Sequence, residues 1–148
     1  MHVIAVGRLK DGPEAVLFER YDSRLRPRLK VIEVTEARGS ATEVKRREAA
    51  ALLAAIPKGA LVVALDLGGA VLDSAQFSER LTGWGHAACF VIGGAEGLDA
   101  SVLARADFVM SLGAMTWPHF LVRPMLAEQI YRAQSIAAGH PYHRAGRP

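Results

Sequence analysis

Residues 61–67 read Leu61-Val62-Val63-Ala64-Leu65-Asp66-Leu67, an apolar run that only Asp66 interrupts. This pattern is typical of a central strand in a parallel sheet, because helices cover both faces of such a strand. Shorter apolar runs predict four more strands, at residues 2–6, 29–35, 87–92 and 108–111. Segments with helical signals separate them, at residues 12–27, 40–56, 74–84, 99–106 and 118–138. The alternation predicts an α/β fold, a mostly parallel open sheet with helices on both faces.

Prolines mark the expected limits of the first and last helices. The first helix opens at Gly12-Pro13 and is expected to end at Pro27. Its apolar stripe is Leu17, Tyr21 and Leu25. In the last helix, Pro124 is expected either to bend the helix or to delay its start.

The second helix has a well-defined start. Ser40 and Glu43 have the spacing of a capping box, in which each side chain binds the backbone N–H of the other residue. We expect this helix to bury Val44, Leu52 and Ile56 and to stop at Pro57-Lys58-Gly59.

Length and composition favour a single folded domain over residues 1–148. The chain is 51% apolar and 22% charged, with a net charge of +3, which excludes a disordered chain. Cys89 is the one cysteine, so the sequence offers no intramolecular disulfide and no cysteine-based zinc site, and we expect no metal. Its apolar neighbours predict a buried thiol. No segment has the pattern of an export signal or a membrane span, so a soluble cytoplasmic protein is expected.

Basic residues concentrate in the first part of the chain. Residues 1–59 contain 12 Lys and Arg against 8 Asp and Glu, whereas residues 60–148 contain 6 against 7. The excess lies in the segments 24–30 and 45–47, which hold Arg24, Arg26, Arg28, Lys30, Lys45, Arg46 and Arg47. They fit either a polyanionic partner such as RNA or ordinary solvated helix surfaces. No aromatic residue is interleaved with them, so a single-strand stacking platform is not predicted.

Glycine-rich segments follow three of the predicted strands. They are Asp66-Leu67-Gly68-Gly69, Gly93-Gly94-Ala95-Glu96-Gly97 and Leu112-Gly113-Ala114-Met115-Thr116. Ligands of open α/β sheets bind at the carboxyl ends of the strands, so we expect a site there. The alternative is that these glycines only make tight turns.

The loops lack the usual phosphate-binding motifs. Neither a dinucleotide-binding G-x-G-x-x-G nor a P-loop occurs, and Glu96 would repel a phosphate. A neutral or cationic ligand fits better, held by backbone groups and by apolar walls such as Leu65, Leu112, Met115 and Trp117.

The chain ends in a second cluster of polar groups, His140-Pro141-Tyr142-His143-Arg144. Polar termini are most often disordered. Two imidazoles, a phenol and a guanidinium nevertheless suit contact with phosphates and bases better than a metal.

Five segments together resemble the RlmH family of SPOUT-class methyltransferases. They are residues 90–98 (FVIGGAEGL), residues 111–119 (SLGAMTWPH) followed by Leu121-Val122-Arg123, and residues 128–133 (EQIYRA) with the ending 140–144 (HPYHR). The resemblance covers the whole chain, but Ala95, Trp117 and Pro124 depart from the common pattern. It implies a trefoil knot in the C-terminal half, S-adenosylmethionine as methyl donor, and a homodimer. It also implies methylation of N3 of a pseudouridine in 23S rRNA within the 70S ribosome, and neither a membrane nor DNA is expected as a partner.

The resemblance also assigns residues. Its cofactor site carries over to Leu65, Gly93, Leu112, Gly113, Ala114, Met115, Thr116 and Trp117. Its tail carries over to His140, Tyr142, His143 and Arg144, which reach the target base, with a reach across the dimer left open. His143 is the candidate base and Arg144 the group that stabilises the deprotonated imide or holds a phosphate.

Several alternatives stay open. His119 is a lesser candidate for the base and is more often structural at a helix start. Glu96 either favours the sulfonium charge or caps the helix near Asp99. The main rival function is a ribosome-associated RNA-binding protein of the same fold without catalysis, and a phosphate- or flavin-binding module ranks last.

Overall fold

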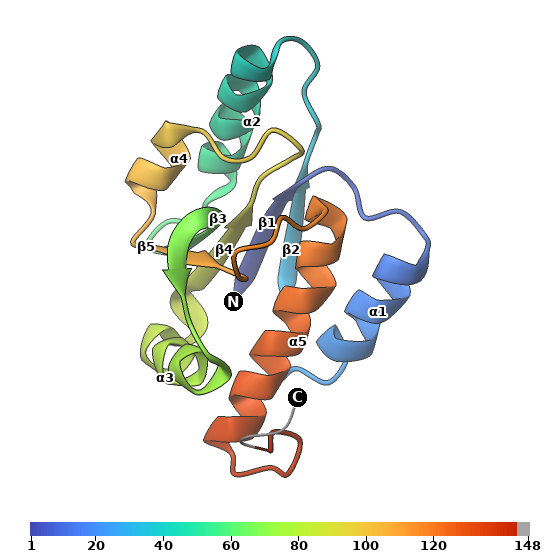
Figure 1. Cartoon of the computed structure of the whole chain (residues 1–148), viewed down its shortest axis with the longest axis vertical. Coiled ribbons are helices and arrows are strands. Elements are labelled where there is room, and N and C mark those ends of the chain that lie inside the picture. Colours follow the sequence, from blue (N-terminus) through green and yellow to red (C-terminus); the bar gives the residue numbers. More distant parts are fainter. Residues whose placement is uncertain (145–148) are drawn as a thin grey trace.

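The computed structural model describes residues 1–144 and shows a five-stranded sheet in the order β2-β1-β4-β3-β5 (Figure 1). The strands are β1 (His2–Val6), β2 (Lys30–Val34), β3 (Leu61–Val71), β4 (Ala88–Ile92) and β5 (Phe108–Ser111). Every neighbouring pair runs parallel. The predicted parallel α/β sheet is therefore confirmed, and the last four residues of the predicted domain, 145–148, lie outside the described part.

Helices cover both faces of the sheet. One face carries α1 (Pro13–Asp22), α3 (Ser74–Trp84) and α5 (His119–Ala137). The other carries α2 (Ala41–Ala55) and α4 (Ala100–Arg105), and a short 3-10 turn, η1 (Gly85–Ala87), leads into β4. All of β4 is buried, with Phe90 in the core under α3 and α5, and Val91 in the core under α2 and α4. Alternate side chains of one strand thus supply both cores.

The predicted capping box starts α2. The Ser40 hydroxyl accepts the Glu43 N–H at 3.4 Å, and the Glu43 carboxylate accepts the Ser40 N–H at 3.1 Å. The prediction of the buried side was less accurate. Leu52 is buried as expected, but its buried companions are Glu48 and Ala49, whereas Val44 and Ile56 are only partly covered.

The first helix ends earlier than predicted. It stops at Asp22, five residues before Pro27, so the expectation that Pro27 ends it was wrong. The cause is the Asp22 carboxylate, which accepts the Leu29 N–H at 2.8 Å and the Arg28 Nε–H at 2.8 Å. These bonds fold the chain back toward β2. Leu25 is buried, but in the segment after the helix.

The third strand is longer than predicted. Residues 66–69 are not a loop beyond the strand but a bulge within it, because both Leu65 and Ala70 pair with Met110 of β5. Gly69 crosses β5 so closely that a Cβ there would lie 2.5 Å from the Met110 carbonyl carbon. Only glycine fits at this crossing.

The last helix runs through its proline. It begins at His119, so of the two effects expected of Pro124, a bend or a delayed start, the delayed start is excluded. The Pro118 carbonyl accepts the N–H groups of Leu121 and Val122, which closes the first turn before Pro124 is reached. Strand β3 lies between β4 and β5 in the sheet, an order compatible with the trefoil knot, which stays a prediction.

Candidate functional site

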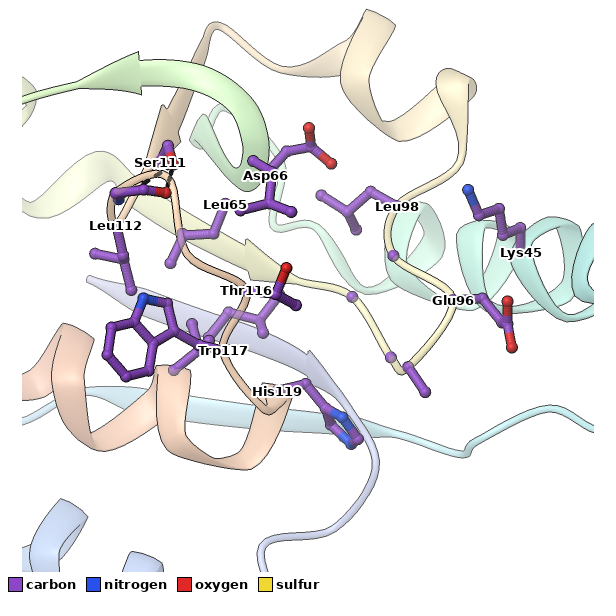
Figure 2. A pocket seen from close by; sticks show the side chains of 18 residues that line it. Lys45, Leu65, Asp66, Glu96, Leu98, Ser111, Leu112, Thr116, Trp117 and His119 are labelled. Atoms are coloured by element: carbon purple, nitrogen blue, oxygen red, sulfur yellow. Dashed lines mark hydrogen bonds between the residues drawn. The ribbon is translucent and has the colours of Figure 1, made fainter.

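A cavity of about 360 Å³ lies at the carboxyl edge of the sheet (Figure 2). Three segments enclose it: the end of β3, the loop after β4, and the loop between β5 and α5. Its volume lies in the range of small-molecule sites, roughly 300–1,000 Å³. The three glycine-rich segments that the sequence singled out therefore meet at one place.

The loop after β4 is a tight backbone turn. Gly94 and Gly97 form an isolated bridge, in which the Gly97 N–H donates to the Gly94 carbonyl at 3.1 Å. Gly97 has a φ of +78°, which favours glycine. A Cβ on Gly93 would lie 3.0 Å from the Gly97 carbonyl carbon. The loop can thus bring its backbone close to the cavity, beside the side chains of Glu96 and Leu98.

The hydroxyl of Ser111 stabilises the loop after β5. Ser111 Oγ donates to the Gly113 carbonyl at 2.8 Å and accepts the Gly113 N–H at 3.2 Å. Gly113 has a φ of +112°. Figure 2 shows the Leu112 and Trp117 side chains on one side of the cavity and Thr116 near its centre.

Most of the predicted cofactor residues line the cavity. Those that do are Leu65, Gly93, Leu112, Gly113, Thr116 and Trp117. Ala114 and Met115 lie in the same loop but do not line it, and Met115 is 67% exposed. Lining residues that were not predicted as cofactor residues include Lys45, His119 and Val122, which come from α2 and from the first turn of α5.

Two charged side chains on one side of the cavity have no ion-pair partner in the described chain. Lys45 of α2 and Glu96 lie on the same side in Figure 2, yet within residues 1–144 neither takes part in an ion pair. Glu96 does not cap α4, because Asp99 accepts the Ser101 N–H at 2.9 Å. The Ser101 hydroxyl and N–H also lower the pKa of the Asp99 carboxyl. Glu96 is therefore left for a ligand or for solvent.

A buried arginine fixes the first turns of α5 beside the cavity. Arg123 is 1% exposed and donates to Glu33 Oε1 at 2.7 Å, to the Val6 carbonyl at 2.9 Å and to the Gly7 carbonyl. Glu33 Oε1 also accepts the Leu9 N–H at 2.7 Å. These bonds tie the start of α5 to the ends of β1 and β2.

Unpartnered buried atoms gather in the same region. In the described chain they are Glu48 Oε2, His119 Nε2 and Arg123 Nε. His119 lines the cavity, and its Nε2 lies 3.7 Å from Glu36 Oε1, too far for a hydrogen bond. Glu48 lies behind the glycine loop, since a Cβ on Gly94 would come within 2.8 Å of its Oε2. Buried polar groups without partners are uncommon and often mark functional sites.

Comparison with known proteins identifies the family. A family model described as "Predicted SPOUT methyltransferase" matches residues 1–143. A protein of Gluconacetobacter diazotrophicus named "Ribosomal RNA large subunit methyltransferase H" is 60% identical over 151 residues, spanning 100% of this chain and 99% of the relative. The chain belongs to the RlmH family of SPOUT methyltransferases.

Other relatives agree with this assignment. A protein of the same name from Acidiphilium cryptum is 54% identical over 151 residues, covering 100% of this chain and 96% of the relative. Among solved structures, a probable methylase family protein from Haemophilus influenzae has a TM-score of 0.63 at 8% identity, over 99% of this chain and 71% of that one. The SpoU methyltransferase AviRb from Streptomyces viridochromogenes, solved in complex with AdoMet, has a TM-score of 0.52 at 15% identity over 93% of this chain. This chain spans 58% of the length of AviRb, and both structural matches show the fold alone.

The C-terminal tail of this RlmH-family chain packs on the far end of α5. Tyr142 donates its hydroxyl to Glu128 Oε1 at 3.0 Å and lies edge-on to the Tyr131 ring, with the ring centroids 4.7 Å apart. Burial, with hydrogen bonds to Tyr21 and Glu128, raises the pKa of the Tyr142 phenol. The Arg132 guanidinium lies 5.0 Å over the Tyr142 ring, and its Nη1 is 3.4 Å from Nδ1 of His143.

This packing separates the tail from the cavity within one chain. The cavity borders α5 at His119 and Val122, whereas the tail contacts Glu128 and Arg132. At 1.5 Å per residue, the six to thirteen residues of helix between these two groups span roughly 9–20 Å. Figure 1 shows the residues after α5 at the end of the helix that is remote from the 111–118 loop. The two predicted groups of site residues therefore do not meet in the single chain.

The two basic segments also differ in structure. In the first, Arg28 is paired with Asp22 at 2.8 Å and with Glu19 at 2.6 Å, and the Arg24 guanidinium lies 5.7 Å over the Tyr131 ring. In the second, the Arg47 guanidinium donates to the Arg38 carbonyl at 3.2 Å. Ion pairs thus engage Arg28 within the chain, and the choice between RNA contact and a solvated surface stays open for these segments.

Residues 1–144 contain neither a clustered metal-binding group nor a membrane-spanning helix. No group of three or more His, Cys, Asp or Glu side chains is placed to hold a metal ion. None of the helices in that part of the chain has the length and apolar character needed to cross a bilayer.

Proposed function

We propose that this chain is a cytoplasmic, S-adenosylmethionine-dependent rRNA methyltransferase that works as a homodimer. Its proposed target is N3 of a pseudouridine in 23S rRNA of the assembled 70S ribosome. Membership of the RlmH family supports the reaction class, since the curated relatives bear the name of a large-subunit rRNA methyltransferase. The observation that carries the proposal is the meeting of three glycine-rich segments at one cavity beside strands β3, β4 and β5.

The cavity suits S-adenosylmethionine by its chemistry. Leu65, Leu112 and Trp117 offer apolar walls, and the glycine turns offer backbone N–H and C=O groups to a nucleoside and an amino acid. The unpartnered Nε2 of His119 lies in the same wall. Asp66 and Glu96 provide negative charge that favours a sulfonium and disfavours a phosphate. When bound, this donor supplies an electrophilic methyl group.

The chain's own contribution is then alignment and removal of a proton. Holding the reacting atoms in line is worth up to roughly 7–11 kcal/mol, whereas a positioned base contributes about 10²–10⁴-fold. The imide proton must leave N3 before or during transfer. Among the tail residues, His143 is the proposed base, Arg144 the proposed anion-stabilising group and Tyr142 a neutral hydroxyl that shapes their position.

A homodimer would join the two halves of the site. Since the tail lies along α5 away from the cavity of its own chain, we propose that it reaches the cavity of the partner. Four large apolar side chains are exposed on and next to the segments around the cavity: Leu67 at 56%, Val71 at 68%, Met115 at 67% and Trp117 at 36%. Exposed apolar patches commonly mark contact surfaces, which fits a second copy covering them.

Radiolabelled methyl transfer tests the proposal. The wild-type chain should label unmodified 70S ribosomes and should label separated subunits and free rRNA far less. The labelled nucleoside should be an N3-methylated pseudouridine. Calorimetry with S-adenosylmethionine runs beside it. Binding of the donor without any transfer, or no binding at all, would instead favour the rival function of a non-catalytic RNA-binding protein.

A further inference from the structure

A second cavity, of about 860 Å³, lies beside the first at the carboxyl ends of β1 and β2. Its walls are the loop 7–12 before α1 and the loop 34–38 before α2, and Phe120 of α5 contributes to its lining. We call it the β1–β2 cleft. His119 lines the first cavity, and the next residue, Phe120, lines the β1–β2 cleft. The two cavities therefore adjoin across the first turn of α5.

Cations without partners line the β1–β2 cleft. Arg8, Lys10 and Arg38 are exposed, and within residues 1–144 their side chains take part in no ion pair or hydrogen bond. Arg38 is also close to the second basic segment, because its carbonyl accepts a hydrogen bond from Arg47. Arg38 thus connects this cleft to the second basic segment, in α2.

The acidic groups of the cleft are partly neutralised. Glu33 is bound by the Arg123 guanidinium at 2.7 Å, whereas Glu36 Oε1 lies 3.7 Å from His119 Nε2, beyond hydrogen-bond distance. Asp11 and Glu14 remain unpaired in the described chain, and both lie where the loop enters α1. With Glu36, the carboxylates of the cleft that have no Lys or Arg partner in the described chain number three, the same as the free cations, and Arg38 lies on the loop before α2 whereas Asp11 and Glu14 lie at the start of α1.

The cleft also contains an aromatic face. The Phe120 ring centroid is 4.0 Å from that of His119, with the planes at 42°, and the Arg123 guanidinium lies 5.9 Å over the ring. Sites for single-stranded nucleic acid combine a basic groove with aromatic rings on which bases stack. The chain has no aromatic residue near Arg8 or Arg38 in sequence, and the fold supplies one from α5.

We propose that the β1–β2 cleft binds the RNA strand that flanks the target nucleotide. Arg8, Lys10 and Arg38 contact its phosphates, and an unstacked base lies on Phe120. This inference rests on the proposed function, because it requires an RNA substrate beside the donor cavity. It also assigns phosphate binding to this edge of the sheet, away from the Arg28 ion pairs.

A pair of charge-matched variants tests the phosphate contacts. Arg8→Gln with Arg38→Gln removes two cations that make no contact within the described chain. Lys30→Gln with Lys58→Gln is the control, since both lysines are exposed at the opposite edge of the sheet, where Lys30 begins β2 and Lys58 precedes β3. Methyl transfer to unmodified 70S ribosomes, S-adenosylmethionine affinity and the salt dependence of binding to protein-free 23S rRNA are measured for both.

We expect the Arg8/Arg38 variant to raise KM for ribosomes about tenfold, with donor affinity unchanged. Its plot of log affinity against log salt should be shallower by about 1.4, because each single-strand phosphate contact contributes about 0.7 to the slope. The lysine control should match the wild type. In Phe120→Leu, loss of stacking should weaken RNA binding about tenfold while the salt slope stays that of the wild type.

Three results would overturn the inference. An unchanged KM and salt slope in the Arg8/Arg38 variant would show that these two arginines do not contact phosphates. Equal losses in the lysine control would show that the effect comes from the net charge of the protein alone. A raised KM on ribosomes with normal binding to free rRNA would assign the cleft to a ribosomal protein. A wild-type chain that neither binds the donor nor transfers methyl groups is a different failure, because it removes the proposed function itself.

Discussion

The Arg123 guanidinium is buried, and it donates hydrogen bonds to two backbone carbonyls and one carboxylate. Arg123→Met should lower the free energy of unfolding by about 3 kcal/mol, the lower end for breaking a buried pair, because Glu33 keeps 31% exposure and can be solvated. Urea denaturation measures the loss. Arg105→Met is the control: its pair with Asp107 is exposed, so it should change stability by about 0–1 kcal/mol. Equal losses in both variants would contradict a special role for burial.

Cys89 is fully buried, and burial raises the pKa of its thiol from a usual value near 9 to about 11. The folded chain therefore keeps a proton that the unfolded chain loses between pH 9 and 11. The contribution of the protonated Cys89 thiol to the free energy of unfolding is fully present below pH 9. It declines by about 2 kcal/mol as the pH rises toward 11. Urea denaturation from pH 8 to 11 should show this decline, and Cys89→Ala should lack that part of it.

The same burial makes Cys89 unreactive. A thiol reagent at pH 8 should leave the folded protein unlabelled and should label one thiol per chain in urea, because the thiolate is the reactive form. Rapid labelling of the folded protein would show that the thiol is accessible.

At the scale of the element, the bulge of β3 depends on one glycine. Gly69→Ala would place a Cβ within 2.5–2.7 Å of Met110 backbone atoms, which cannot move independently of β5. We expect a loss of about 1–3 kcal/mol in the free energy of unfolding and weaker binding of S-adenosylmethionine, since residues 65–67 line the cavity. Gly83→Ala is the matched control. Its added Cβ meets nothing within 4 Å inside α3, so it should be neutral or stabilising by up to about 1 kcal/mol.

The elements that sequence patterns predicted well are those with local causes. The strand at residues 108–111 and the helix at 74–84 were predicted at their observed limits, and the Ser40–Glu43 box marked the start of α2. The errors had distant causes. The α1 terminus depends on the hydrogen bond that the Leu29 N–H, outside the helix, donates to Asp22, and the β3 bulge depends on pairing with Met110, about forty residues away. Such contacts leave no periodic signal in the sequence.

At the scale of the whole molecule, the sequence predicted the part of the candidate site that is formed by the segments at the strand ends. Glycine-rich segments after three strands indicated one ligand edge, and they do line one cavity. His119 and Lys45 join this cavity from two helices, and Phe120 joins the neighbouring β1–β2 cleft from α5. Helix placement over a sheet depends on side-chain packing, so local patterns do not give these neighbours. The distance between tail and cavity also emerges only in three dimensions.

The separation of the C-terminal tail from the cavity of its own chain leads to a prediction about dimers made of two different variants. If the tail completes the partner's cavity, Arg144→Ala should abolish methyl transfer while leaving S-adenosylmethionine binding nearly intact. Thr116→Arg, with a long cation in the middle of the cavity, should abolish donor binding while leaving the tail intact. Each homodimer is then inactive, but a mixed dimer has one cavity and one tail that are both intact.

Subunits exchanged at equal concentrations should recover roughly a quarter of wild-type activity, since half of the dimers are mixed and each has one working site of two. Recovery requires exchange, so dimers crosslinked before mixing are the control and should stay inactive. If tail and cavity instead serve the same subunit, the Thr116→Arg subunit binds no donor and the Arg144→Ala subunit lacks its tail group, so freely exchanging mixtures would stay inactive as well.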